Sequence, residues 1–522
     1  MSLFASFSVV SGATLLSRVL GLLRDVLFFA AFGTSIYGEA FLLAFTIPNL
    51  FRRMLGEGTL TSAFIPVFSD SQLVNKNNWS LLNEVLTRLF VFLGCLSVFV
   101  AFFTLLTHQF SWFSNPKWYL ANYLNGVTFF YVIFICASAI LVGALNVRDR
   151  FLEGSLSPVV LNLFLIFALC FVGFNRDLSF GQKALFLSLA VVGAGLFQLY
   201  LPWFRLSKNF GWKFKWKFSN SSELSEVSSL FWVGAFGAAI AQVNILVSRI
   251  LAYTLDDPGG VSYLYMTARL VELPLGVFAI AISTILFPVL SRAASKGDKV
   301  LYKSSFFAGL RMISMLTIPS SIGLLLLGEL VISVLFEWKA FGESNVVMAS
   351  EVLMIVAWTI PLYALSTFLI KSYHSQKNMK VPLRAALLSL LVNVVCSLTF
   401  MSAYGVKGLA WAHLAAAFAQ FTFLYCKNPE LSWSSLVRNN QICLPKIFAA
   451  ACTMFFSIQL IRLVFDTAAN KFGLFLQLSL FILVGAFCYF LALMLLKFPL
   501  AGRKHLLSLI SRNYAMLTKF LK

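Results

Sequence analysis

Long apolar runs, each close to the length of a membrane-spanning helix, recur from one end of the sequence to the other. A helix needs about 20 apolar residues to cross the hydrocarbon core, and an open sheet in lipid would leave its edge groups unpaired. The runs are too long for barrel strands, which need only about 10 residues. Only 11% of the residues are charged, against about 25% in soluble proteins. The sequence therefore predicts an all-α, polytopic integral membrane protein.

About fourteen transmembrane helices are predicted by this length rule. Lys and Arg are concentrated in alternate loops and in the C-terminal tail, and such residues accumulate on the cytoplasmic side. Both termini are therefore expected in the cytoplasm, and the N-terminus lacks the basic start and cleavage site of a signal peptide. The predicted spans are 5–31, 37–68, 86–107, 121–146, 157–175, 184–204, 227–253, 261–291, 304–336, 345–373, 382–403, 406–426, 444–465 and 473–496.

The longest loop, residues 208–226, alternates lysines with large aromatic side chains. Together with the net charge of +20, this pattern allows a single-stranded nucleic-acid partner. Next to a membrane span, however, basic and aromatic residues more often anchor a segment at the lipid interface. The loop is therefore predicted to be an amphipathic cytoplasmic linker, and no nucleic-acid partner is expected.

The sequence also contains an internal repeat. SAFIPVFS at 62–69 resembles TILFPVLS at 284–291, and the proline of SPVVLNLFL at 158 matches the one of VPLRAALLSLLVN at 382, at nearly the same offset. The offset spans an even number of helices, so the two copies have the same topology, as in parallel-repeat transporters. We predict an N-lobe of six spans at 1–207, the linker at 208–226, a C-lobe of six spans at 227–430, and spans 13 and 14 with a basic tail at 431–522.

Charged residues stand inside the first two predicted spans, where a charge at the bilayer centre costs from about 3 to over 10 kcal/mol. Arginine and acidic residues of the eighth span join them if the two lobes enclose a cleft. Arginine favours two-point contact with phosphate, so the cluster indicates a cavity for an anionic substrate. The proposed set comprises Arg18, Arg24, Arg52 and Arg269, with the acidic residues Asp25, Glu39, Glu57 and Glu272 in support.

Internal pairing is the competing interpretation of the same charges. Arg269 and Glu272 are three residues apart on one helix, Arg18 and Asp25 are seven apart, and Arg53 and Glu57 are four apart, spacings that place side chains on one face. The arginines within these spans outnumber the acidic residues only slightly. The residues alone therefore leave open both a substrate cavity and a set of structural ion pairs.

Three residues near the charges are candidate hinges, namely Gly21, Pro48 and Pro274. Proline bends a transmembrane helix because it removes one helical hydrogen bond. No nucleophile elbow, P-loop, zinc motif or other catalytic motif is present, and the histidines and cysteines are scattered. We therefore expect a transporter rather than an enzyme, with no cofactor and no metal site.

Four segments resemble the MurJ (MviN) family of lipid II flippases: SRVLGLLRD at 17–25, EAFLLAFTIPNLFRRMLGEG at 39–58, AFIPVFS at 63–69, and YMTARLVELPLGVFAIAISTILFPVLS at 265–291. The resemblance covers spans 1–12 in order. It implies a flippase of the bacterial inner membrane that moves undecaprenyl-diphosphate-linked peptidoglycan precursor to the outer leaflet. It also implies that spans 13 and 14 form a groove for the lipid tail.

The resemblance extends to particular residues. The family's cavity arginines match Arg18, Arg24, Arg52 and Arg269, and its acidic partners match Glu39 and Glu272. Some family members bind sodium on spans 7 and 11 through acidic and amide groups. Here those spans offer Asn244 and Asn393 without a carboxylate, so a sodium site of that kind is not expected.

Other functions remain open from the residues. The chain could flip another polyprenyl-linked sugar or export drugs, although a cavity for cationic drugs should be lined by carboxylates rather than arginines. A polyprenyl-phosphate enzyme would need a nucleophile or a metal site. A membrane scaffold would tolerate loss of the arginines. For a flippase of this kind, membrane lipids and the cell-wall synthesis machinery are the further expected partners.

Overall fold

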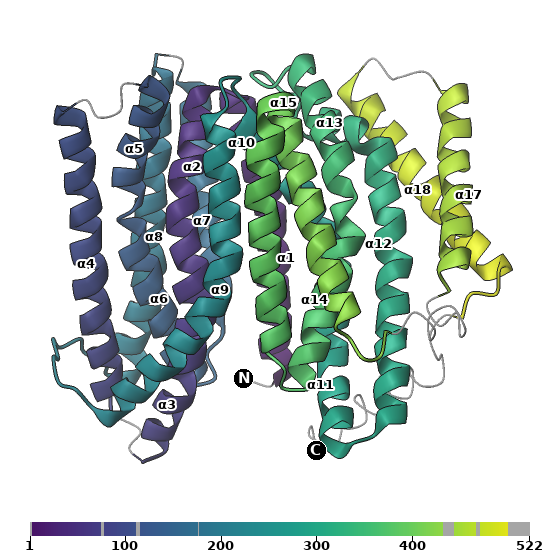
Figure 1. Ribbon diagram of the computed structural model, residues 1–522. Helices are drawn as coiled ribbons and strands as arrows, with labels where there is room; N and C mark the ends of the chain where they lie inside the picture. Colours follow the sequence, from purple (N-terminus) through teal and green to yellow (C-terminus); the bar gives the residue numbers. More distant parts are fainter. Residues whose placement is uncertain are drawn as a thin grey trace. The chain divides into compact units, whose positions relative to one another are not determined.

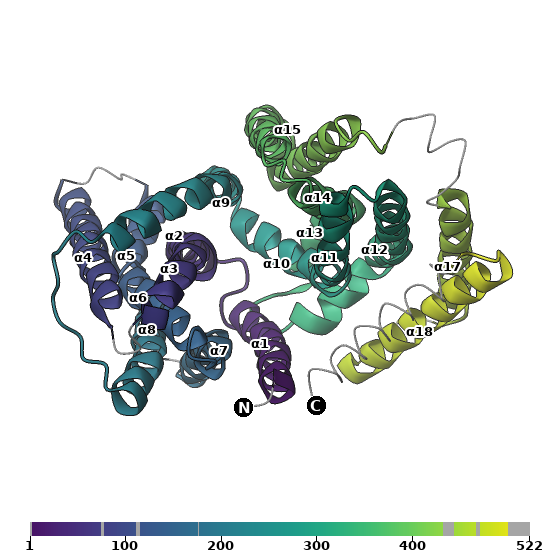
Figure 2. The same cartoon turned by 90° about the horizontal axis from the view of Figure 1, so that it is seen from below.

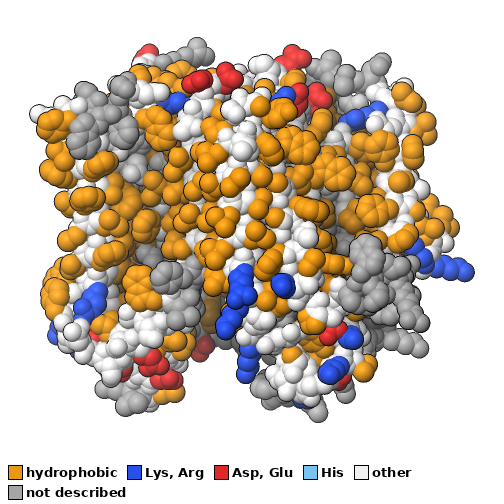
Figure 3. Space-filling model, in the orientation of Figure 1, with side chains coloured by type: hydrophobic (Ala, Val, Ile, Leu, Met, Phe, Trp, Pro, Cys, Tyr) orange, Lys and Arg blue, Asp and Glu red, His pale blue; other side chains and the backbone are white. Residues whose placement is uncertain are grey.

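The computed structural model describes residues 3–74, 78–110, 115–175, 177–431, 443–465 and 470–499, and this part of the chain is built from helices without any strand. Ten helical stretches of it are long and apolar enough to cross a membrane. Hydrophobic side chains cover the middle of the face seen in Figure 3, and charged side chains lie mainly toward its upper and lower parts. The predicted all-α, polytopic membrane fold is therefore confirmed.

The chain divides into two compact units, residues 1–262 with 336–345, and residues 263–335 with 346–522. Helices of the first unit are α1 (Leu3–Phe32), α2 (Ile36–Phe51), the π-helix η1 (Arg52–Thr59), α3 (Leu60–Val74), α4 (Ser80–Gln109), α5 (Pro116–Thr128), α6 (Tyr131–Asn146), α7 (Leu152–Phe174), α8 (Phe180–Phe210) and α9 (Ser222–Thr254). The repeat assigns α9 to the C-lobe, but α9 packs on α3 and η1 within the first unit.

The second unit contains most of the remaining helices (Figure 1). These are α10 (Gly260–Pro274), the π-helix η2 (Leu275–Ile280), α11 (Ala281–Lys296), α12 (Lys299–Phe336), α13 (Glu343–Ala357), α14 (Thr359–Ser375), α15 (Lys380–Cys426), α17 (Leu444–Val464) and α18 (Lys471–Leu495). Helix α15 includes predicted spans 11 and 12, which are separated by Gly405 at φ 56° and ψ −132°. Only glycine adopts such backbone angles readily, so the span boundary lies at this residue.

Two predicted spans of each half of the sequence, the second and the fourth, consist of more than one helix and have matching forms in the two halves. Pro48 precedes η1 and α3, and Pro274 precedes η2 and α11, so each second span runs from helix through π-helix to helix. Each fourth span is broken near its middle, between α5 and α6 and between α13 and α14. The two halves of the sequence thus share these interruptions, although π-helical segments are rare.

Packing in the first unit joins α1 to α7, α6 to α8, and α2 to α5. Figure 2 shows α1 beside α7 when this unit is seen from below. Helices α6 and α8 approach closely at Gly195, where an added Cβ would lie 2.6 Å from the Tyr131 ring. Small residues permit such contacts, and van der Waals packing rather than the hydrophobic effect holds helices together in lipid.

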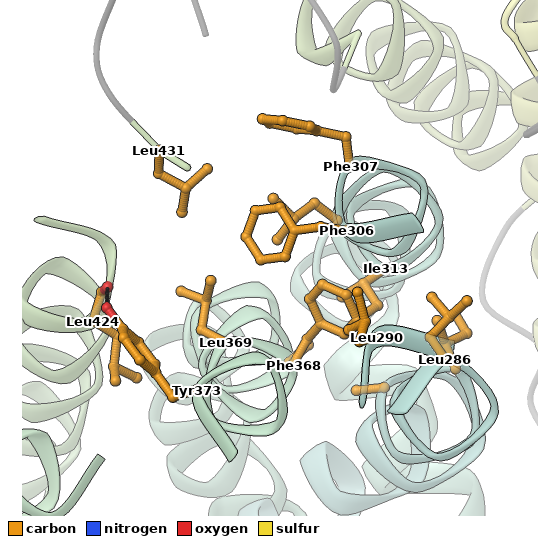
Figure 4. Close-up of a cluster of buried hydrophobic side chains, with 14 of the residues drawn as sticks. Leu286, Leu290, Phe306, Phe307, Ile313, Phe368, Leu369, Tyr373, Leu424 and Leu431 are labelled. Carbon is orange, nitrogen blue, oxygen red and sulfur yellow. Dashed lines mark hydrogen bonds between the residues drawn. The ribbon is translucent and has the colours of Figure 1, made fainter. Parts of the chain in front are cut away.

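A cluster of aromatic and aliphatic side chains forms the centre of the second unit (Figure 4). Phe306 of α12 stacks on Phe368 of α14 with ring centroids 5.7 Å apart, and Gly309 leaves room for the Phe368 ring. Tyr373 donates a hydrogen bond to the carbonyl oxygen of Leu424 at 2.9 Å. Helices α17 and α18 pack on each other and on α12 through a second cluster that includes Ile447, Ile458 and Phe481.

Hydroxyl groups satisfy four of the carbonyl oxygens that prolines leave without a helical donor. A proline cannot donate to the carbonyl four residues before it, and an unpaired carbonyl in lipid costs several kcal/mol. In the described chain, helix prolines 48, 202, 319 and 361 each have such a partner. Thr128 donates to Ala44 at 3.2 Å, Ser138 to Gln198 at 2.8 Å, Tyr489 to Met315 at 2.7 Å, and Ser321 to Ala357 at 2.8 Å.

Candidate functional site

A cavity of about 490 Å³ in the first unit is lined by Arg18 of α1 and Arg52 of η1. Its size lies within the usual range for small-molecule sites, about 300–1,000 Å³. The wall also carries several hydroxyl groups and one amide, which are able to accept hydrogen bonds from a polar ligand. These polar lining residues are Thr14, Ser17, Thr61, Ser138, Asn146, Ser155 and Ser157.

The two arginines of this cavity differ in their contacts. Arg18 is exposed, and no hydrogen bond or ion pair joins it to any other described residue. Arg52 begins the π-helix η1 and donates through Nε to Oδ1 of Asn49 at 3.0 Å. Because no described residue pairs with Arg18, its guanidinium is available to an anion.

Arg24 belongs to a polar network between α1 and α7. Its Nε and Nη2 approach Oδ1 of Asp25 at 3.0 and 2.6 Å, and its Nη1 donates to Oδ1 of Asn162 at 3.0 Å. Asn162 donates in turn through Nδ2 to the Ser17 carbonyl oxygen at 3.0 Å. The proposed hinge residue Gly21 lies opposite Asn162, where an added Cβ would be 3.6 Å from Nδ2. Asp25 thus contacts Arg24, its neighbour, in this network.

Glu39 is fully buried in the first turn of α2. The backbone N–H groups of Val261 and Ser262, at the start of α10, donate to its Oε1 at 2.7 and 3.4 Å. Its Oε2 lies 3.7 Å from Nζ of Lys117, and Lys117 also donates to the Leu255 carbonyl oxygen at 3.0 Å. In the described chain Glu39 therefore binds a lysine and a helix N-terminus, a favourable place for an anion, rather than an arginine.

The predicted pair on α10 is present in the second unit. Nη1 of Arg269 lies 3.0 Å from Oε2 of Glu272, and Nη2 of Arg269 donates to the Tyr265 hydroxyl at 2.9 Å. The Arg269 guanidinium also covers the Tyr265 ring at 4.8 Å from its centroid. The side chains of Arg269 and Glu272 are 31% and 50% exposed. The pair is therefore partly open to solvent.

Three further predicted residues need separate mention. Pro48 and Pro274 lie where the helix changes to or approaches a π-helix, four residues before η1 and directly before η2. The side chain of Glu57 lies outside the described residues. Among described residues, no group of three or more His, Cys, Asp and Glu side chains could hold a metal ion.

Sequence reasoning missed the partners that hold the predicted charges. Asn162, Asn49, Tyr265 and Lys117 are single polar residues whose contacts depend on which helices become neighbours. Asn162 carried a usable signal, because it is an amide inside the predicted span 157–175 and polar groups in spans usually face other helices. Lys117 carried none, because it stands in a loop between predicted spans.

Comparisons with known proteins agree with this architecture. The family described as lipid II flippase MurJ matches residues 28–468. The probable lipid II flippase MurJ of Buchnera aphidicola subsp. Baizongia pistaciae is 32% identical over 469 residues, covering 87% of this chain and 89% of that protein. That of Bdellovibrio bacteriovorus is 33% identical over 432 residues, covering 79% of each chain.

Solved structures extend the comparison to the fold. A structure described as lipid II flippase MurJ in an inward closed conformation has a TM-score of 0.75 and 25% identity, covering 92% of this chain and 97% of that one. An inward-facing multidrug resistance transporter of the MATE family has a TM-score of 0.64 at 13% identity, covering 82% of this chain and 96% of that one. The second likeness concerns the fold alone.

Proposed function

Because the chain belongs to the lipid II flippase MurJ family, we propose that it carries the undecaprenyl-diphosphate-linked peptidoglycan precursor from the cytoplasmic to the outer leaflet of the bacterial inner membrane. Transport proceeds by alternating access, with both termini in the cytoplasm. The protein moves its substrate without a chemical step. The polyprenyl tail stays in lipid throughout, since withdrawing it costs about 0.8 kcal/mol per CH₂.

One observation carries the substrate assignment beyond family membership. Arg18, which has no partner among the described residues, lines the same cavity as Arg52. A diphosphate offers several anionic oxygens, and arginine binds such groups through two parallel hydrogen bonds. The surrounding hydroxyls suit the sugar and peptide parts of the headgroup. A cavity for cationic drugs would need carboxylates in these positions.

Arg24 and Arg269 have a second role in this proposal. Each is paired with an acidic side chain close by in sequence, Asp25 and Glu272 respectively. At each arginine, an anionic group of the headgroup replaces the carboxylate as the acceptor, and the carboxylate pairs with the arginine again after release. The exchange keeps Arg24, whose side chain is only 12% exposed, partnered with and without substrate, which matters because an uncompensated buried charge costs about 3–5 kcal/mol.

The decisive experiment is precursor translocation in cells depleted of this protein. We expect outer-leaflet exposure of the lipid-linked disaccharide-peptide to fall on depletion and to return with the wild-type chain. Unchanged exposure on depletion would overturn the proposed function. Parallel measurement of another polyprenyl-linked sugar distinguishes lipid II from a related substrate, because only the former should respond.

Single substitutions then test the cavity. Arg18→Ala is expected to lower translocation roughly tenfold or more, because a hydrogen bond to a charged group contributes about 1.5–3 kcal/mol. Arg18→Lys keeps the charge without the two-point contact, so its translocation rate should lie between those of the wild type and Arg18→Ala. Arg292→Ala is the matched control, since Arg292 is exposed at the end of α11 and lines no described cavity. Normal translocation by Arg18→Ala at wild-type expression would reject the cavity.

A further inference from the structure

The segment between α8 and α9, residues 211–221, is fixed to the first turns of α4, and we call it the strap. Figures 1 and 2 show it running along the lower end of α4. It leaves α8 through Gly211 at φ 65°, a left-handed helix end that glycine favours. Trp212 follows, fully buried, and donates through Nε1 to Oδ1 of Asn83 at 3.0 Å.

Glu84 of α4 is the central acceptor that holds the strap. This buried carboxylate pairs with Nζ of Lys217 at 3.0 Å and accepts hydrogen bonds from Ser219 at 2.7 Å and Ser221 at 2.6 Å. The backbone N–H of Lys217 also donates to Oγ1 of Thr87 at 3.0 Å. Several charge-assisted bonds on one carboxylate make the strap a fixed surface rather than a loose loop.

The aromatic side chains of the strap form a ladder that leads outward. Trp212 contacts Phe214, Phe214 lies 5.1 Å from Trp216 between ring centroids, and Trp216 stacks on Phe218 at 6.3 Å. Trp212 is fully buried, whereas Trp216 and Phe218 are 61% and 67% exposed. One edge of Trp216 lies against Phe90 of α4, with ring centroids 6.4 Å apart, and the outer rungs still present a large exposed aromatic surface.

Two lysines stand between these aromatic residues. Lys213 and Lys215 are exposed, and neither side chain makes a hydrogen bond or ion pair within the described chain. Lys217, the third lysine of the alternation, is engaged by Glu84. The free pair gives the outer face of the strap a net positive charge.

The position of the strap indicates what kind of partner it binds. Helices α4 and α8 are both long and apolar enough to cross the membrane, and the strap joins the end of α8 to the first turns of α4. The strap therefore lies at the level of the lipid headgroups. Aromatic side chains such as Trp are enriched at this level, and lysines there attract anionic lipid. The basic loops indicate that this is the cytoplasmic leaflet.

We propose that the strap is a preformed binding surface for anionic phospholipid headgroups, with Lys213 and Lys215 binding the phosphates and Trp216 and Phe218 inserted among the upper acyl chains. The inference is independent of the transported substrate. Because Ser221 both caps α9 and bonds Glu84, lipid bound at the strap lies directly beside the start of α9.

The test uses the full chain in nanodiscs that contain equal amounts of phosphatidylglycerol and phosphatidylcholine, with bromine on the acyl chains of one lipid at a time. The signal is the tryptophan emission of the wild type minus that of Trp216→Phe, which isolates Trp216. We expect brominated phosphatidylglycerol to quench this signal more strongly than brominated phosphatidylcholine. Each lysine near an anionic surface should contribute about a fivefold preference.

Lys213→Gln with Lys215→Gln is expected to make the two lipids quench equally. The matched control is Lys296→Gln with Lys299→Gln, which removes the same charge from exposed lysines beside α11 and α12 and should retain the preference. Equal quenching in the wild type, or no loss with the strap lysines removed, overturns the proposal. Stronger quenching by a dye-labelled single-stranded oligonucleotide than by either lipid would assign the surface to nucleic acid instead and also overturn it.

Discussion

The hydroxyl of Tyr489 on α18 donates a hydrogen bond to the Met315 carbonyl oxygen of α12 at 2.7 Å. Pro319 lies four residues after Met315 and cannot supply the usual helical donor. Tyr489 is almost fully buried, so its hydroxyl has no water to replace this bond. The contact therefore joins the C-terminal helix pair to α12 at a defect that the sequence of α12 itself creates.

Tyr489→Phe should destabilise the second unit by about 0.6–2 kcal/mol, the range measured for hydrogen bonds between membrane helices. Pro319→Ala restores an N–H donor to the Met315 carbonyl, so the cost of Tyr489→Phe should largely vanish in the double variant. Denaturant unfolding in detergent micelles measures both. Tyr200→Phe is the control, since Tyr200 is exposed on α8. Equal cost of Tyr489→Phe with and without Pro319 would contradict this explanation.

Asn162→Ala should lower precursor translocation, because Arg24 loses its acceptor on α7 and α1 loses the bond from Nδ2 to the Ser17 carbonyl oxygen. Each bond lost between helices costs about 0.6–2 kcal/mol, which corresponds to roughly a threefold to thirtyfold effect. The control is Leu163→Ala, the next residue of α7, whose side chain is exposed. Translocation that is equal for the two variants would show that Asn162 does not position Arg24.

Glu84→Gln should release the strap from α4, because the amide loses its charge and cannot hold Lys217 while accepting from Ser219 and Ser221. Hydrogen exchange at the backbone N–H of Lys217, which donates to Thr87, should then accelerate by at least tenfold, as for the loss of about 1.4 kcal/mol or more. Glu153→Gln is the control, since Glu153 pairs with Arg205 on α8 away from the strap. Unchanged hydrogen exchange at Lys217 would show that Glu84 does not hold the strap on α4.

Much of the fold follows from the sequence because lipid allows few alternatives. A backbone in hydrocarbon must pair with itself, so the length of each apolar run determines where a helix begins and ends. The boundary predicted between 403 and 406 coincides with the backbone reversal at Gly405. At Pro48 and Pro274 the sequence predicted only a bend, and not the π-helices that follow. A proline determines which hydrogen bond is lost, but not the hydrogen-bond pattern of the next turns.

The candidate site is predictable only in part. The arginines stand out because charges are costly in apolar runs, and local spacing predicts the Arg269–Glu272 pair that the structure contains. The partners of Glu39 are far away in sequence, at Lys117 and at the start of α10. Such contacts depend on helix neighbours rather than on spacing along one helix. Sequence therefore indicates which residues need partners better than which partners they find.

The Glu39–Lys117 pair allows a test of how a buried charge is held. Lys117→Met leaves the fully buried Glu39 carboxylate with backbone N–H groups alone, and should destabilise the first unit by about 3–5 kcal/mol, the cost of breaking a buried pair. Glu39→Gln with Lys117→Met removes both charges and should recover most of that loss, because the amide oxygen can still accept from Val261.

Thermal unfolding of the purified chain in micelles measures these two variants against the wild type. Lys183→Met is the matched control, because Lys183 stands in the first turn of α8 without a carboxylate partner among the described residues, so removing its charge strands no acid. The argument fails if Lys117→Met is as stable as Lys183→Met, or if the double variant is less stable than Lys117→Met alone. Either result would mean that the backbone of α10, rather than Lys117, stabilises the negative charge of Glu39.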